Sequence, residues 1–288
     1  MWTDKGYMII RNFLNVAPQI HAMSNIYPPS RKDEKIHDFG NDGKTTFPCN
    51  YEVFNKISVS EKLIDLASYL LRGRVRLRQS VAWAKYGDRG ENEDQRMHVD
   101  YGNNMWGRPP PWHKPNAVAM ILYYSDTSKT GGSTSVVPYR PDLYKNSQAM
   151  MPGQGNIPFA NNREDAEELM RLYDPEGWEL RKKCYESEIK PVFRPGDLLV
   201  YRLDLWHRGT PVRKNKIRYV HNFLWALEDA PISNWNSFTR KLYYGWLEKF
   251  IRNLSEKQQF TLGIKKKRPG EIHSKNVVLP EGAFVLIE

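Results

Sequence analysis

Two histidines and one aspartate stand where their side chains could share a metal ion. His98 and Asp100 form a His-x-Asp pair in "RMHVDYG", and residues two apart in an extended chain project from the same face. An isolated His-x-Asp is common by chance, and without further support it favours a hydrogen-bonded surface pair. His207 follows "RPGDLLVYRLDLW", a Gly-Asp turn and predicted strand that would return the chain to the same end of a barrel. Two histidines and a carboxylate are the ligands typical of non-haem Fe(II) oxygenases, which keep coordination positions open.

Arg218 is suited to hold a co-substrate beside such a metal. 2-Oxoglutarate would occupy open positions through its keto-acid end, and its far carboxylate needs a cation. A guanidinium binds a carboxylate bidentately, which a lysine cannot do. In "KIRYVHNFLW", strand alternation puts Arg218 and Asn222 on one face and His221 on the other. We therefore expect Arg218 to point into a pocket and His221 to have no ligand role.

The elements around these residues are mostly short strands. From Ser80 onward, apolar or aromatic runs such as "VAWAKYG", "AVAMILYYSD" and "DLLVYRLD" alternate with Gly, Pro and Asp turns. This pattern is typical of an antiparallel sandwich or barrel.

Helical patterns are confined to the flanks and to one insertion. We predict a helix over 58–71 that begins at an N-cap, Ser58 or Ser60, and ends at Gly73. Two further helices are predicted over 162–173 and 237–259. A strand leading into a helix is predicted over 5–14, and a loop over 27–50.

Together these segments resemble the phytanoyl-CoA dioxygenase family of Fe(II)- and 2-oxoglutarate-dependent oxygenases. "GYMIIRNFL" is similar to the family's opening strand and helix, "MHVD" to its His-x-Asp, and "YYSDTSKTGGSTSVVP" to a Gly pair before a strand ending in Val-Pro. "RPGDLLVYRLDLWHRGTPVRKNKIR" resembles its Gly-Asp strand, distal histidine and co-substrate arginine. The resemblance implies a mainly β fold with flanking helices, a double-stranded β-helix or cupin-like jelly roll. It also implies that His98, Asp100 and His207 bind iron and that Arg218 binds 2-oxoglutarate.

The chain departs from the family pattern at two places. Family members often carry a serine two residues after the distal histidine, where this chain has Gly209, and Thr210 is the candidate to replace that hydroxyl. The Val-Pro segment continues as "VPYRPD" instead of a Gly-Ser-His turn, so Tyr139 and Arg140 are expected to reshape the pocket mouth.

Further pocket residues are expected on the strand before His98. Gln79 and Lys85 are candidates for co-substrate binding, and Trp83 lies between them. Aromatic residues offer a cleft lining, although core packing explains them equally well. These are Trp83, Tyr101, Trp106 and Trp112. The remaining histidines are expected to be surface or core residues: His21, His37, His113, His221 and His273.

We predict one oxygenase domain over 1–288. It would comprise an N-terminal helical and strand support over 1–78, a jelly-roll core over 79–228 with an inserted segment at about 140–190, and a C-terminal helical extension with a basic tail over 229–288.

The resemblance implies a dioxygenase that hydroxylates a small-molecule substrate. It would consume O2 and 2-oxoglutarate, release succinate and CO2, and take ascorbate as a candidate reductant. Asp100 disfavours halogenation, because a halogenase leaves that ligand position open for chloride. The substrate, and the choice between hydroxylation, desaturation and ring chemistry, stay open.

The net charge of +10 favours anionic partners. Arg72, Arg74, Arg76 and Arg78 recur at period two, and 265–268 is a basic cluster. The arginines are explained either by a charged edge strand or by a strip that attracts an anion. If the protein is a small-molecule oxygenase, its substrate could therefore be anionic. The alternative functions are a nucleic-acid-binding protein and an oxygenase that acts on nucleic acid. A non-enzymatic cupin would be expected to lack one member of the triad.

The two cysteines, Cys49 and Cys184, suggest neither a disulfide framework nor a zinc site. The longest apolar run, "AVAMILYY", is far shorter than the roughly 20 residues that span a bilayer. Charged residues interrupt "MWTDKGYMIIRNFL", so no signal peptide is expected. We expect a soluble, cytoplasmic protein, and its oligomeric state stays open.

Overall fold

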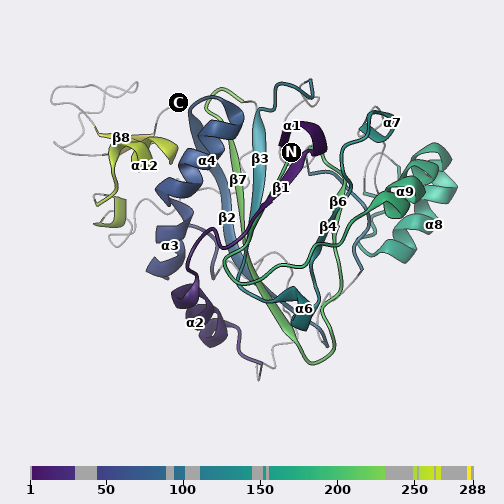
Figure 1. Ribbon diagram of the computed structural model, residues 1–288, viewed down its shortest axis with the longest axis horizontal. Helices are drawn as coiled ribbons and strands as arrows, with labels where there is room; N and C mark the ends of the chain where they lie inside the picture. Colours follow the sequence, from purple (N-terminus) through teal and green to yellow (C-terminus); the bar gives the residue numbers. More distant parts are fainter. Residues whose placement is uncertain are drawn as a thin grey trace.

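Two antiparallel sheets face each other in the computed structural model (Figure 1). The structure describes residues 2–29, 44–88, 94–100, 111–144, 152–153, 156–230, 249–251, 253–262, 264–266 and 284–286. The large sheet has the strand order β1 (Tyr7–Ile10), β5 (Leu198–Tyr201), β3 (Ala117–Tyr123), β7 (Ile217–Leu227) and β2 (Val75–Tyr86). The small sheet pairs β4 (Thr134–Val136) with β6 (His207–Gly209), and a separate pair joins β8 (Ile264–Lys266) to β9 (Phe284–Leu286).

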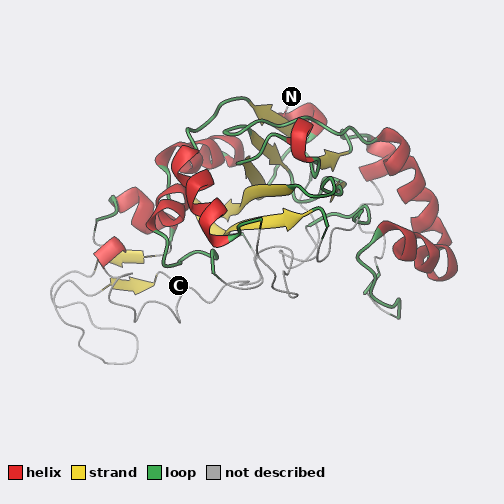
Figure 2. Ribbon diagram, turned by 90° about the horizontal axis from the view of Figure 1, so that it is seen from below, coloured by secondary structure: helices red, strands yellow, loops and turns green. Residues whose placement is uncertain are grey.

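Helices cover the outer faces of both sheets (Figures 1 and 2). The large sheet is covered by α2 (Ala17–Ile26), α3 (Glu52–Ser58) and α4 (Glu61–Leu71), and α8 (Arg163–Tyr173) and α9 (Pro175–Ser187) lie beyond the small sheet. Four further helices are short: α1 (Trp2–Lys5), α6 (Thr127–Thr130), α7 (Pro141–Tyr144) and α12 (Glu256–Thr261). None of these helices is long and apolar enough to cross a membrane.

Side-chain alternation separates two cores on either face of the large sheet. Val220 and Leu224 of β7 belong to the core between the two sheets. Phe223 and Trp225 belong to the core beneath the helices. The same alternation continues across β3 and β5, because neighbouring residues in register share a face. This arrangement of two facing antiparallel sheets confirms the predicted jelly roll with flanking helices.

The arginine pattern before the core does not form a single strip. Arg72 adopts a left-handed conformation, φ 56°, as the C-cap of α4, so it ends that helix one residue before the predicted Gly73. The register of β2 against β7 then shifts between Leu77 and Gln79, which leaves Arg78 in a bulge. A bulge reverses which face the following residues occupy. The interpretation of four arginines on one strand face was therefore wrong.

The helix predictions were partly right. The helix over 162–173 is confirmed as α8, where the Asn162 side chain caps the first turn by accepting from the Asp165 amide at 2.9 Å. Helix α9 was not predicted, since its sequence lacks a clear apolar stripe. In the described part of 237–259, α12 starts afresh after Ser255, which forms a capping box with Gln258.

Some predictions fall outside the described residues or stay predictions. The first group comprises His37, Tyr101, Trp106, His273 and the 267–268 end of the basic cluster. The division into 1–78, 79–228 and 229–288 stays a prediction, although α7, α8 and α9 do lie between β4 and β5.

His221 is fully buried beneath the helices, on the face of β7 away from Arg218. Its Nδ1 lies 2.9 Å from the Tyr124 hydroxyl, and its Nε2 lies 2.7 Å from the Ser80 hydroxyl. Ser80 is in turn 2.7 Å from the Ser58 hydroxyl. Burial lowers the pKa of His221 to about 3, so the imidazole is neutral in the folded protein.

This histidine should make the fold sensitive to acid. Between the ordinary histidine pKa of about 6.5 and the folded value of about 3, only the unfolded chain binds the proton, so stability falls as pH falls. We expect His221 to contribute a loss of about 1.4 kcal/mol per pH unit in this window.

Urea unfolding of the wild type and of His221→Gln between pH 7 and pH 5 measures this slope. The variant should be less stable at pH 7 and show a shallower decline. Equal slopes in the two proteins would contradict a neutral, buried His221.

Candidate metal site and adjoining cavity

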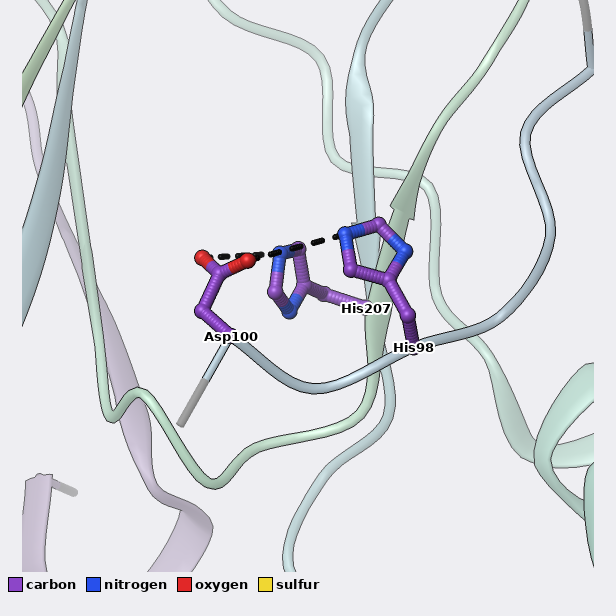
Figure 3. A group of neighbouring side chains, drawn as sticks. All are labelled: His98, Asp100 and His207. Carbon is purple, nitrogen blue, oxygen red and sulfur yellow. Dashed lines mark ion pairs between the residues drawn. The ribbon is translucent and has the colours of Figure 1, made fainter. Parts of the chain in front are cut away.

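Three side chains converge at one end of the space between the sheets (Figure 3). The Nε2 atom of His98 lies 3.7 Å from Oδ1 of Asp100, and Nε2 of His207 lies 3.4 Å from Oδ2. One donor atom from each of the three residues lies within 4.8 Å of the others. A transition metal with bonds of roughly 2 Å can be reached by all three atoms with small side-chain adjustments. The donor set therefore fits the iron that the sequence predicts.

Backbone pairing brings the two distant histidines together. The His98 amide donates to the His207 carbonyl at 3.0 Å, and the His207 amide donates to the His98 carbonyl at 2.9 Å. Asp100 continues the pairing, because its amide donates to the Leu203 carbonyl at 2.9 Å. Residues 94–100 thus run beside β6 as an additional extended segment of the small sheet.

The tautomer of each histidine is set by a backbone carbonyl. Nδ1 of His98 lies 2.9 Å from the Arg96 carbonyl, and Nδ1 of His207 lies 2.9 Å from the Leu205 carbonyl. A carbonyl can only accept, so both Nδ1 atoms carry the hydrogen. Each Nε2 then turns toward Asp100. A hydrogen bond from the other ring nitrogen to a carbonyl is the usual way in which proteins orient metal-binding imidazoles.

The electrostatics of the triad favour a bound cation. Burial, and then the neighbouring His207, lower the pKa of His98 to about 3. Burial opposes ionisation of Asp100, but the charge and hydrogen bond of His207 outweigh it and lower the pKa of the carboxyl. Burial also opposes protonation of His207, yet the charge of Asp100 raises its pKa overall. The attraction that holds a proton at Nε2 of His207 is equally available to a metal ion.

Tyr201 fixes the carboxylate and was not predicted as a site residue. Its hydroxyl donates to Oδ2 of Asp100 at 3.1 Å, and its ring centroid lies 4.6 Å from that of His207. Tyr201 shares the inward face of β5 with Leu199, so the same alternation that placed Arg218 could have found it.

A cavity of about 300 Å³ opens beside the triad. It brings together three of the four predicted co-substrate residues: Gln79, Lys85 and Arg218. Trp83, between Gln79 and Lys85 on β2, also lines it. Thr210 does not, because its hydroxyl donates to the Ser133 carbonyl at 2.8 Å.

Arg218 is buried and held in a defined orientation. Its Nη1 donates to the Gly132 carbonyl at 3.0 Å, and the guanidinium carbon lies 4.2 Å from the centre of a Trp83 ring. Gly132 has φ +70°, and a Cβ there would lie 2.6 Å from Val212 and 3.3 Å from the Arg218 side chain. A glycine is therefore required for the close approach of this turn to Arg218.

Thr134 brings a hydroxyl into the cavity where Thr210 does not. It lies on β4 and lines the cavity, and its Oγ1 accepts from the Tyr123 hydroxyl at 2.9 Å. The hydrogen of Thr134 Oγ1 remains available as a donor. Thr134 is therefore a second candidate for the hydroxyl partner that the sequence placed at Thr210.

The other proposed mouth residues lie away from the cavity lining. Trp112 stacks on Tyr139 with ring centroids 3.7 Å apart, and its indole donates to the Thr3 carbonyl at 2.7 Å. Arg140 pairs with Asp142 at 2.8 Å. His21 and His113 are exposed, as expected for histidines outside the site.

Comparison with protein families gives one match. The family model described as phytanoyl-CoA dioxygenase (PhyH) matches residues 2–220. No curated protein sequence matches the chain.

Several solved structures share the fold at low sequence identity. HygX from Streptomyces hygroscopicus, with nickel and 2-oxoglutarate bound, has a TM-score of 0.54 and 14% identity over 82% of this chain and 87% of its own. The epimerase SnoN, in complex with Fe3+, alpha ketoglutarate and nogalamycin RO, has a TM-score of 0.53 and 13% identity over 82% and 85%. EctD from S. alaskensis, with 2-oxoglutarate and 5-hydroxyectoine, has a TM-score of 0.51 and 16% identity over 81% and 76%.

The triad geometry predicts one metal ion per chain. We expect the protein to bind one equivalent of Co(II), used as a spectroscopic substitute for Fe(II), and His207→Ala to weaken this binding by more than about 100-fold. That loss should exceed the roughly 10- to 100-fold typical of residues that only support a ligand. Absorption titration of the metal-free protein measures both affinities.

His113→Ala is the matched control, because it removes an exposed imidazole outside the cavity. It should bind Co(II) like the wild type. Unchanged Co(II) affinity in His207→Ala would show that the metal does not use this triad.

Proposed function

The chain belongs to the phytanoyl-CoA dioxygenase family, and we propose that it is an Fe(II)- and 2-oxoglutarate-dependent oxygenase that hydroxylates a small organic molecule. The observation that carries this proposal is the convergence of His98, Asp100 and His207 at the wall of a cavity that also contains Arg218. The solved structures with this fold include proteins crystallised with Fe3+ or nickel and with 2-oxoglutarate.

His98, Asp100 and His207 would hold the iron at the wall of the cavity. Bound iron would supply the chemistry of O2 activation coupled to decarboxylation of 2-oxoglutarate to succinate and CO2. The carbonyl-held imidazoles and the Tyr201 hydroxyl would keep the ligands in place throughout the cycle. A buried, oriented ligand set avoids reorganisation when the co-substrate exchanges.

Arg218 would bind the far carboxylate of 2-oxoglutarate. Its contacts with Gly132 and Trp83 orient the guanidinium before the co-substrate arrives. Thr134 supplies a hydroxyl on the same side, and Lys85 is the register partner of Arg218 across β2 and β7. We assign co-substrate binding to this group, with Gln79 on the same face of β2.

The remaining cavity wall is suited to a small carbon skeleton. Ile121, Leu203 and Leu224 provide apolar surface close to the metal site. A volume of about 300 Å³ is at the small end of ligand pockets. Such a space is large enough for a small metabolite.

The basic surface gives little support to the nucleic-acid alternative. The guanidinium carbons of Arg74 and Arg76 lie 3.3 and 3.7 Å from the ring centre of Phe260. Both arginines also lie within 3.9 Å of Glu228. Both arginines have partners within the chain, and Arg76 is buried while Arg74 stays exposed, so these residues do not form a free basic strip and a small-molecule substrate is favoured.

A cytoplasmic location belongs to the same proposal. Cys49 and Cys184 are buried and carry free thiols, which is typical of proteins kept in a reducing compartment.

The co-substrate assignment predicts the effect of replacing Arg218. Wild-type protein should form succinate only when Fe(II), 2-oxoglutarate and O2 are all present. Arg218→Lys should raise the KM for 2-oxoglutarate about 10- to 100-fold, because losing a bidentate charge-assisted pair costs about 1.5–3 kcal/mol. Succinate release measured against 2-oxoglutarate concentration gives this constant.

Arg171→Lys, an exposed position in the last turn of α8, is the matched control and should leave the KM unchanged. An Arg218→Lys enzyme with the wild-type KM would remove Arg218 from the co-substrate site.

A further inference from the structure

A second arginine faces the cavity beside the proposed metal ligands. In the segment 94–100, Met97 and Val99 pack into the core next to α9, whereas Arg96, His98 and Asp100 line the cavity. Residues two apart in an extended chain lie roughly 6–7 Å apart on one face. The Arg96 side chain therefore stands next to the metal site, on the same wall.

The guanidinium of Arg96 is buried without an acidic partner. The residue is only 8% exposed. Its Nη1 donates to Oδ1 of Asn161 at 2.7 Å, and its guanidinium carbon lies 5.5 Å from the Phe159 ring centre. Its Nε is buried with no hydrogen-bond partner, and among the described residues no carboxylate forms an ion pair with it. A buried guanidinium in this state is strongly favoured to gain an anion.

The charges already present in the site do not supply that anion. Asp100 is the carboxylate that acts electrostatically on Arg96, but in the proposed function its charge would be used to bind the metal ion. Arg181, a second buried arginine, adds positive charge nearby. If Asp100 binds the metal and Arg218 binds 2-oxoglutarate, the side-chain contacts that Arg96 keeps among the described residues are with the Asn161 amide and the Phe159 ring.

We propose that Arg96, together with Asn161, binds a carboxylate of the substrate, so that the enzyme acts on a small organic acid. This proposal rests on the function proposed above. A carboxylate is the anion proposed here because its two oxygens accept two parallel hydrogen bonds from the planar guanidinium.

The position of Arg96 limits the shape of this acid. Arg96, His98 and Asp100 line one cavity of about 300 Å³, so an acid held by Arg96 has to be small if its reacting carbon is to reach the metal site. The apolar side chains of Ile121 and Leu203 would contact the intervening carbon atoms. Phe159, which is 72% exposed, lines the same cavity and offers a ring to any part of the acid that extends outward.

Matched pairs of acids and their primary amides test this proposal. The probes are hexanoate, benzoate and phenylacetate with hexanamide, benzamide and phenylacetamide, titrated by ligand-detected NMR into full-length protein loaded with Zn(II) and 2-oxoglutarate. At least one acid should bind, about tenfold or more tightly than its amide. Arg96→Gln should reduce that preference below about twofold, and Arg171→Gln on the surface of α8 should preserve it.

The proposal is overturned if no acid binds, if acids and amides bind equally, or if Arg96→Gln keeps the preference. If Arg96→Gln does not fold, Asn161→Ala takes its place and should also reduce the preference for the acid. The ratio of acid to amide affinity in the wild type needs no variant and tests the proposal in any case.

A separate measurement isolates the proposed function. Anaerobic addition of 2-oxoglutarate to the Fe(II) protein should produce a visible charge-transfer absorption in wild type and in Arg96→Gln at the same co-substrate concentration. Its absence from the wild type would refute the oxygenase assignment. A normal absorption without an acid preference would refute the substrate class alone, and weaker 2-oxoglutarate binding in Arg96→Gln would assign Arg96 to the co-substrate instead.

Discussion

The reciprocal backbone hydrogen bonds between His98 and His207, 3.0 and 2.9 Å long, are the contact on which the site depends. They join segments separated by more than a hundred residues, and they put both imidazoles on the cavity side of the small sheet. The opposite side is held by Arg208, which is 1% exposed and donates to Glu188 at 2.8 and 2.9 Å. Arg208 also pairs with Asp94 at the start of the His98 segment. Buried ion pairs of this kind are costly to break on one side, so they keep the two segments in register.

Register explains why so much of the site could be predicted from the sequence. In a strand every second residue shares a face, and this rule placed Arg218 toward the cavity and His221 away from it. The same rule applied to β5 and to the segment before Asp100 would have reached Tyr201 and Arg96. The information was present in the spacing, but an arginine two residues before His98, or a tyrosine on the strand before His207, has no chemical meaning until its strand is known to face a cavity.

The predictions that failed depended on departures from regular geometry or on contacts across the sheet. The arginine strip was broken by a left-handed residue at Arg72 and by a bulge at Arg78, neither of which changes the residue pattern. Thr210 is adjacent in sequence to the expected position, yet its hydroxyl is taken up by the Ser133 carbonyl. Thr134, on the neighbouring strand β4, lines the cavity instead, and no local sequence signal encodes the pairing that places it there.

The charge balance of the cavity links ligand binding to the stability of the fold. Arg96 and Arg218 are both nearly inaccessible to water, and burial lowers the pKa of Arg96 because it disfavours the charged form. Burial of the Arg96 guanidinium, whose Nε has no hydrogen-bond partner, therefore carries an unfavourable free energy that the rest of the fold must offset. Each anion that enters removes part of it, and a ligand that binds only the folded state stabilises that state. A protein built in this way is most stable when its cavity is occupied, so the same cations that select anionic ligands also couple their binding to folding.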